Sequence, residues 1–539
     1  MRPVAALALL VAGCGPATSP PPDGTLVIAA EQVPTWVRNF HPYALSHHAR
    51  WPTRVAIYEP LAIHTPRGDR WEPVLATAWA WEDERTLRLE LREGVLWSDG
   101  TPFGAADVVG SLELLRDHPG LDRDGLWRVV EGVRARGPFE VEVRLGHPHL
   151  PLLGDLLELP IVQPARWRAF DDPVAQANPD PVGTGPFTEV LRFEDQLFEL
   201  GPNPHAWRPS PVQRLRFPAL GSNEQMLLAL VQGQVDWSGI YVPAVDRTWD
   251  GRDPAHHHHD FPPLGGMVLL VPAAHRAPTD DPRVRKALSL ALDRSRVLEV
   301  AASGYAELPH PTGLPPVFAG WGEGLPGCDW IDHDPARAGA LLDEAGLTRG
   351  EDGWRRLPDG TPWTPELEVV AGWSDWVRAA RLVVRDLRAV GIDARLRAWD
   401  FGAWYDRVPR GLADLAIGWS VVEDDPWSWL GDQLSSRTLE PVGEPASSNW
   451  QRVADPEADA ALATFASSRE PTVRREAFAR VHARLCALAP SVPLYPGPSW
   501  GEASSRRFVG WPSADDPYAR LSPNGLPEPW IVLGHLRPR

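Results

Sequence analysis

The residues best suited to chemistry lie together in one short stretch, IGWSVVEDDPWSW, at 417–429. It holds three flat apolar indole faces and three consecutive acids that only accept hydrogen bonds at neutral pH, namely Trp419, Trp427, Trp429, Glu423, Asp424 and Asp425. Such a stretch is either a surface loop or one wall of a binding site. As a wall it could hold a cation, a peptide amine or the hydroxyl groups of a sugar.

Other motifs that could do chemistry are better explained as structure. SDGTPF at 98–103 has the residues of a turn, so Ser98 and Asp99 are not predicted to be catalytic. PVGTGPF at 181–187 lacks the Gly-Lys-Ser/Thr ending of a phosphate loop and opens a strand. The four histidines at 256–259 are interpreted as a solvated loop, with binding of Zn²⁺ or Ni²⁺ as the alternative.

Length and charge limit the class of protein. The chain has 539 residues, which predicts two or more domains. Its 53 basic and 71 acidic residues give a net charge of −18. That charge repels nucleic acid and anionic membranes, so neither is an expected partner.

The first residues are typical of an export signal. Arg2 precedes the short apolar run PVAALALLVAG, and VAGC resembles the lipoprotein box of bacteria. The sequence therefore predicts a signal peptide over 1–13, acylation of Cys14 and a tether over 14–23; a plain secretory signal is the alternative. Two other cysteines, Cys328 and Cys486, could pair in an exported protein, and the sequence leaves this open.

The rest of the mature chain alternates strands and helices, which predicts an α/β fold. Residues 24–30 are expected to form the first strand, and apolar spacing over 280–301 predicts one helix. Strands near 262–273 and 491–497 are expected to be the two crossings between domains. No other segment is apolar enough to span a membrane.

Several of these segments, in this order, resemble the family 5 extracytoplasmic solute-binding proteins of ABC importers, the group of oligopeptide-, dipeptide- and nickel-binding proteins. The matching stretches include LATAWAWEDERTLRLELREGVLWSDGTPFGAADVVGSLELL (75–115), DPVGTGPF (180–187), VRKALSLALDRSRVLEVA (284–301) and LADLAIGWS (412–420). The resemblance implies a two-lobed periplasmic-binding-protein-like fold (type II, cluster C), with the ligand cleft between the lobes. Lobe one is expected over 24–265 plus 496–539, and lobe two over 266–495.

The resemblance also bears on the ligand. In peptide-binding relatives an aspartate three residues after the conserved tryptophan pairs with the peptide's amino group, and here Val422 stands at that position after Trp419. A buried ammonium without a counter-charge is costly, so valine argues against a peptide, unless Asp424 or Asp425 takes over the role from a neighbouring position. PVGEPASSNWQR (441–452) and RFVGWPSADDPYA (507–519) resemble segments of an oligosaccharide-binding subgroup.

We therefore predict a monomeric lipoprotein at the periplasmic face or cell surface. It would capture an oligosaccharide for an ABC permease, without catalysis, cofactor or bound metal. A short peptide is the alternative ligand, and a secreted glycan hydrolase is the alternative class. The predicted ligand-binding residues combine indole faces with hydroxyl acceptors, and they are Trp36, Trp419, Asp424, Asp425, Trp427 and Trp500.

Overall fold

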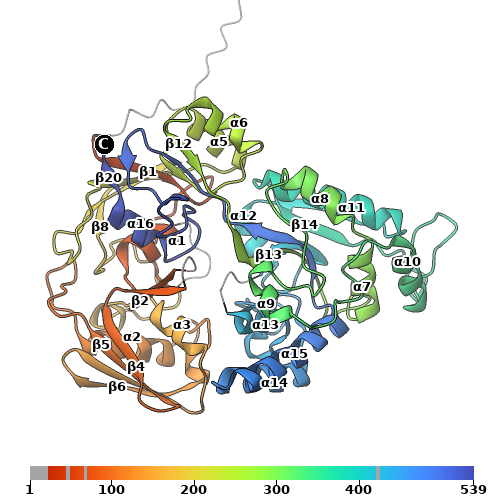
Figure 1. Ribbon diagram of the computed structural model, residues 1–539, viewed down its shortest axis with the longest axis horizontal. Helices are drawn as coiled ribbons and strands as arrows, with labels where there is room; N and C mark the ends of the chain where they lie inside the picture. The colour runs from red at the N-terminus through yellow and green to blue at the C-terminus, as the bar shows by residue number, and fades with distance from the viewer. Residues whose placement is uncertain (1–21, 44–48, 66–68, 421–424) are drawn as a thin grey trace, which may run out of the picture.

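The computed structural model describes residues 22–43, 49–65, 69–420 and 425–539. The chain forms two lobes that lie side by side, and Figure 1 shows that the first contains both the start of the chain and its C-terminal end. This confirms the predicted two-lobed α/β fold. Within the described ranges, no helix is both long and apolar enough to cross a membrane.

A mixed seven-stranded sheet forms the centre of lobe one. Its order is β12-β18-β11-β1-β10-β9-β8, so β18, from near the C-terminus, lies inside it. The strands are β1 (Thr25–Ala29), β8 (Phe187–Glu194), β9 (Leu197–Pro202), β10 (Arg214–Pro218), β11 (Trp237–Ser238), β12 (His257–His259) and β18 (Glu502–Ser504). β1 is buried along its whole length, as its apolar sequence predicts.

Lobe one also carries a separate antiparallel sheet and two short two-stranded pairs. The four-stranded sheet has the order β4-β5-β7-β6, with β4 (Ala76–Trp81), β5 (Thr86–Leu91), β6 (Val130–Gly137) and β7 (Glu140–Leu145). The two-stranded pairs are β2 (Ala62–Thr65) with β3 (Arg70–Pro73), and β19 (Phe508–Val509) with β20 (Arg537–Pro538). The helices of this lobe are α1 (Arg50–Pro52), α2 (Ala105–Asp117), α3 (Leu152–Leu157), α4 (Pro164–Trp167), α5 (Asn223–Val231), α6 (Val245–Thr248) and α16 (Pro529–His535).

Lobe two is built on a five-stranded sheet of order β15-β14-β16-β13-β17. Its strands are β13 (Pro263–Pro272), β14 (Glu366–Val370), β15 (Arg395–Trp399), β16 (Leu415–Trp419) and β17 (Val492–Pro498). Its helices are α7 (Pro282–Leu290), α8 (Arg294–Ala301), α9 (Ala319–Gly322), α10 (Pro335–Glu344), α11 (Ser374–Ala389), α12 (Phe401–Arg407), α13 (Pro426–Leu434), α14 (Pro456–Ser467) and α15 (Pro471–Leu488).

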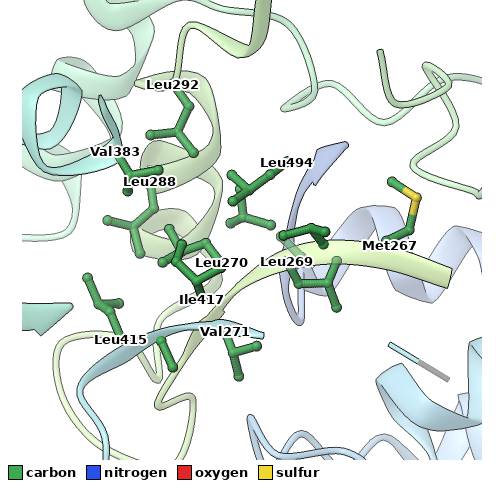
Figure 2. Packing of buried hydrophobic residues seen from close by; sticks show 14 of the residues in the cluster. Met267, Leu269, Leu270, Val271, Leu288, Leu292, Val383, Leu415, Ile417 and Leu494 are labelled. Atoms are coloured by element: carbon green, nitrogen blue, oxygen red, sulfur yellow. The ribbon is translucent and has the colours of Figure 1, made fainter. Parts of the chain in front are cut away.

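Aliphatic side chains from β13, β16 and β17 interlock with those of α7 and α11 to form the core of lobe two. Figure 2 shows Leu270 and Ile417 on neighbouring strands facing Leu288 of α7. This packing holds β16 in place, and Trp419 is the last residue of that strand.

The segment 280–301 is two helices rather than the single helix that its spacing predicts. Asp293 interrupts it and accepts a hydrogen bond from the backbone N–H of Arg296, which caps α8. The guanidinium of Arg294 donates to the backbone carbonyls of Ser289, Ile331 and Pro493, which fixes this break inside the lobe.

The chain passes between the lobes on two neighbouring strands. β13 and β17 pair antiparallel, and both predicted crossing points fall inside them. The exact lobe boundaries at 265/266 and 495/496 remain a prediction. Two adjacent strands are few connections for lobes of this size, which suits a hinge.

Candidate functional site

A cavity of about 910 Å³ lies between the lobes. Both lobes and the returning chain after β17 contribute to its lining. Its aromatic residues are Tyr43, Trp71, Trp321, Tyr405, Trp419 and Trp500. A cavity of this volume, lined by these aromatic rings together with many charged and polar side chains, has the dimensions of a small-ligand site.

Trp419 ends β16 and forms the centre of the lobe-two wall. Its ring lies parallel to that of Tyr405, with centroids 6.0 Å apart and an interplanar angle of 10°. Trp404 stacks on it at 5.2 Å, and Trp450 meets it edge-on at 5.0 Å. These contacts hold the partly buried indole in one orientation before any ligand arrives.

Trp500 follows β17, so the second crossing strand positions it. Its ring makes edge contacts with Tyr241 at 5.5 Å and with Phe261 at 4.8 Å. The structure thus brings Trp419 and Trp500, two of the predicted ligand-binding residues, to the same cavity.

Asp425 also lines the cavity, where it begins α13. Its carboxylate accepts a hydrogen bond from the backbone N–H of Trp427 at 3.3 Å and lies 4.0 Å from Arg474. Burial raises the pKa of Asp425 to about 6, although these two neighbours oppose the shift. Asp425 is therefore both a helix cap and a cavity-facing acceptor.

Two predicted site residues belong to the protein interior instead. Trp36 is 5% exposed and packs edge-on against Phe198 and Phe217 in the core of lobe one. Trp427 is 6% exposed and donates its indole N–H to the carbonyl of Leu462 at 3.0 Å. The prediction that these two indoles line the cleft is wrong, because closely packed neighbours cover them. Asp424, Val422 and Cys14 lie outside the described residues.

The cavity also contains residues that the sequence did not single out. Trp71, Trp321, Tyr43 and Tyr405 add aromatic surface, and Arg50, Arg54 and Arg123 add positive charge from lobe one. A signal for part of this set exists in RWPTRVAI, where two arginines are spaced four residues apart. The aromatic residues carry no comparable signal, because nothing local separates a cleft indole from a core indole.

The lobes touch again away from the crossing strands. The backbone N–H of Leu150 donates to the carbonyl of Ala466 at 2.8 Å, and Arg128 lies 3.9 Å from Glu440. His149 is 5% exposed and meets Trp427 edge-on at 4.9 Å. The lobes therefore meet at a second place besides the two crossing strands.

The histidine tract is part of a strand, not the solvated loop that was predicted. β12 pairs with β18, and His257 stacks on Trp249 with ring centroids 3.5 Å apart. His256 contacts Asp253, and His259 contacts Asp250. Because each ring has its own protein partner, the four histidines do not converge on one ion.

Cys328 and Cys486 form a disulfide bond, which answers the question that the sequence left open. The bond joins the segment before α10 to α15, at a sequence separation of 158. His482 lies close to both sulfur atoms. In the bonded form the cysteines offer no thiolates to a metal.

The model of the bacterial extracellular solute-binding proteins, family 5, matches residues 70–439, more than half of the chain. Di/tripeptide-binding protein 2 of Pseudomonas aeruginosa (strain UCBPP-PA14) is 25% identical over 486 residues, covering 82% of this chain and 85% of that protein. The nickel-binding periplasmic protein of Escherichia coli (strain K12) is 25% identical over 398 residues, covering 70% and 73%.

Solved structures have the same fold. The mannohexaose-bound periplasmic oligopeptide-binding protein of an oligopeptide ABC transporter from Thermotoga maritima superposes with a TM-score of 0.86, at 22% identity over 97% of this chain and 100% of that one. The oligopeptide-binding protein AppA of Bacillus subtilis, in complex with a nonapeptide, gives 0.81 at 17% identity, with coverage of 97% and 100%. The chain therefore belongs to the family 5 bacterial extracellular solute-binding proteins.

Proposed function

We propose that this protein captures an oligosaccharide and delivers it to the permease of an ABC importer. The observation that supports this most is the aromatic wall of the interlobe cavity, where Trp419 lies parallel to Tyr405. Pyranose rings have apolar C–H faces that stack on such rings, and hydroxyl groups that donate to carboxylates. Asp425 supplies a cavity-facing carboxylate for the second interaction.

The mode of capture follows from the crossing strands. Rotation about β13 and β17 would open the cavity, and ligand contacts to both lobes would stabilise the closed form. A monomer held to the membrane through an acylated Cys14 would present the closed form to the permease. Mass spectrometry of the N-terminal peptide tests the anchor, since acylation adds the mass of its lipid chains.

A short peptide is the second candidate ligand, and two observations favour it. Several similar proteins have names that refer to peptides, and Asp425 is a carboxylate on the cavity surface that could pair with an amino group. Against this, Asp425 already caps α13, its pKa is raised to about 6, and Val422 replaces the acid expected in peptide binders.

Isothermal titration calorimetry tests the proposal directly. The purified protein is titrated with manno-, cello- and xylo-oligosaccharides of four to six units and, separately, with a mixture of di- to pentapeptides. We expect saturable heat from at least one sugar series, with the sugar recovered unchanged afterwards. Tight peptide binding with no heat from any sugar would contradict the proposal, and shortened sugar products would indicate a glycan hydrolase.

A further inference from the structure

Two arginines on the lobe-one wall of the cavity lack a partner in the described protein. Arg54 lies in a single π-helical turn, η1 (Thr53–Ile57), and Arg123 lies in the loop between α2 and the 3₁₀ turn η2 (Leu126–Arg128). Both line the cavity, and the Nε of each is buried without an acceptor. No hydrogen bond or ion pair joins either guanidinium to another residue in the described ranges.

The fold holds Arg54 in this place. Val55 and Ile57 are buried in the lobe-one core on either side of it, so η1 cannot easily turn its arginine toward solvent. Arg50, four residues earlier in the chain, lines the same cavity. Burial lowers the pKa of Arg54, and the positive charge of Arg50 lowers it further.

The carboxylates on this wall do not neutralise the two arginines. Asp122 accepts hydrogen bonds from the backbone N–H groups of Leu126 and Trp127. Glu158 accepts one from the backbone N–H of His64, and burial raises its pKa to about 7, so it is only partly charged at neutral pH. Its charge raises the pKa of Arg54, but no ion pair joins these two described side chains.

Three further acids of the cavity lining also form no ion pair with either arginine. Glu528 forms an ion pair with Arg520, and Asp69 lies 2.9 Å from His64. Asp124 is exposed, and although its charge raises the pKa of both arginines, no ion pair joins it to Arg54 or Arg123.

A buried cation without a counter-ion is unfavourable, and proteins retain such groups where a ligand supplies the opposite charge. Guanidinium groups favour planar oxyanions, which accept two parallel hydrogen bonds. Resting on the proposed oligosaccharide function, we propose that Arg54 and Arg123 receive a carboxylate carried by the sugar, so that the ligand is an acidic, uronic-acid-containing oligosaccharide.

The test uses three probes that differ in charge and class. Oligogalacturonic acid of four to six units is compared by calorimetry with its methyl ester, which keeps the ring shape but removes the charge. A neutral manno-oligosaccharide of the same length is the third probe. We expect the acid to bind roughly 10- to 100-fold more tightly than its ester, the range for hydrogen bonds to charged groups, and its affinity to fall as NaCl is added.

Arg54→Gln and Arg123→Gln connect the effect to these side chains. Each variant should reduce the preference for acid over ester roughly tenfold while leaving the affinity for the ester nearly unchanged. Each should also raise the melting temperature of the ligand-free protein, because a partly buried charge that forms no ion pair is removed. Arg296→Gln, on the exposed surface of α8, is the matched control and should change neither quantity.

The outcomes separate this inference from the proposed function. Equal binding of acid, ester and neutral sugar would overturn the proposal that Arg54 and Arg123 receive a carboxylate. It would leave the proposed oligosaccharide function intact. Preference for the acid that survives both substitutions also overturns it. Peptide binding with no heat from any of the three sugars overturns the proposed function and the inference together.

Discussion

The two walls of the cavity differ in chemistry. The lobe-two wall presents parallel rings, Tyr405 and Trp419, supported by other indoles. The lobe-one wall presents guanidinium groups, including Arg54 and Arg123, among carboxylates. The binding free energy from stacking on rings depends little on the charge of the ligand. The binding free energy from the guanidinium groups of the lobe-one wall depends on that charge strongly. The comparison suggests that lobe two supplies general affinity and lobe one supplies selectivity.

The walls also differ in how they are supported. Trp419 ends a strand of a five-stranded sheet, and a disulfide bond joins two other parts of the same lobe. Arg123 lies in a loop, and Arg54 in a single helical turn. Trp419 thus belongs to a strand that is paired on both sides, whereas neither arginine lies in a sheet.

The largest effect is expected from removing the disulfide bond of lobe two. Cys328→Ser with Cys486→Ser opens a loop that spans a sequence separation of 158, which should cost about 5 kcal/mol of unfolding free energy. Calorimetric melting should then show lobe two unfolding at a lower temperature, with lobe one little changed. A single transition at an unchanged melting temperature would show that the disulfide bond does not stabilise lobe two more than lobe one.

Truncating the stacking surface should have the next largest effect. Trp419→Ala should weaken sugar binding by about 2–3 kcal/mol, or roughly 100-fold, since a central, pre-oriented aromatic anchor is lost. The weakening should be similar for acidic and neutral sugars. Trp354→Ala, in a turn outside the cavity lining, is the matched control. A loss confined to acidic sugars would contradict the division of roles between the walls.

The contact between the lobes should make binding depend on pH. Burial, followed by Arg437 and His147, lowers the pKa of His149 to about 3 in the closed form. A histidine exposed by opening titrates near its ordinary value of about 6.5, so acidification below that value favours the open form. Between pH 7 and pH 5 closure should lose about 2 kcal/mol, weakening binding roughly 20- to 30-fold.

His149→Asn isolates this contribution, because every other titrating group remains. Dissociation constants of both proteins are measured from pH 7 to pH 5, and the variant should lose most of the pH dependence. The same dependence in the variant would assign it to other groups, such as Asp425.

The smallest effect is expected at Asp425. Asp425→Asn keeps a helix cap and a hydrogen-bond acceptor, so sugar affinity should change by about 1 kcal/mol or less. For a peptide whose amino group pairs with Asp425, the same substitution should reduce affinity by several kcal/mol, since the ammonium would lose its counter-charge. Titration of the variant with both ligand classes therefore distinguishes the two.

Sequence reasoning placed the ordered elements well because apolar spacing is local. It predicted β1, and it predicted the crossing strands that became β13 and β17. It missed the break at Asp293, because the apolar spacing continues past a residue whose capping role depends on backbone geometry. It also missed strand β12, whose partner β18 is distant in the sequence.

For the site, residue type was less informative than position. Trp419 and Trp36 were both predicted to bind the ligand, yet one lines the cavity and the other lies in the lobe-one core. Which face of an indole is covered depends on residues far away in the chain, such as Phe198 and Phe217 for Trp36. The positive wall was overlooked because the overall charge of −18 conceals a local cluster of opposite sign.

A crystal structure with the tightest-binding sugar would test the central claim most directly. The account predicts lobes closed on the ligand, with one pyranose ring stacked on Trp419 and the chain extending toward Trp500. A ligand held mainly by an amino group at Asp425, with Trp419 uncovered, would contradict it.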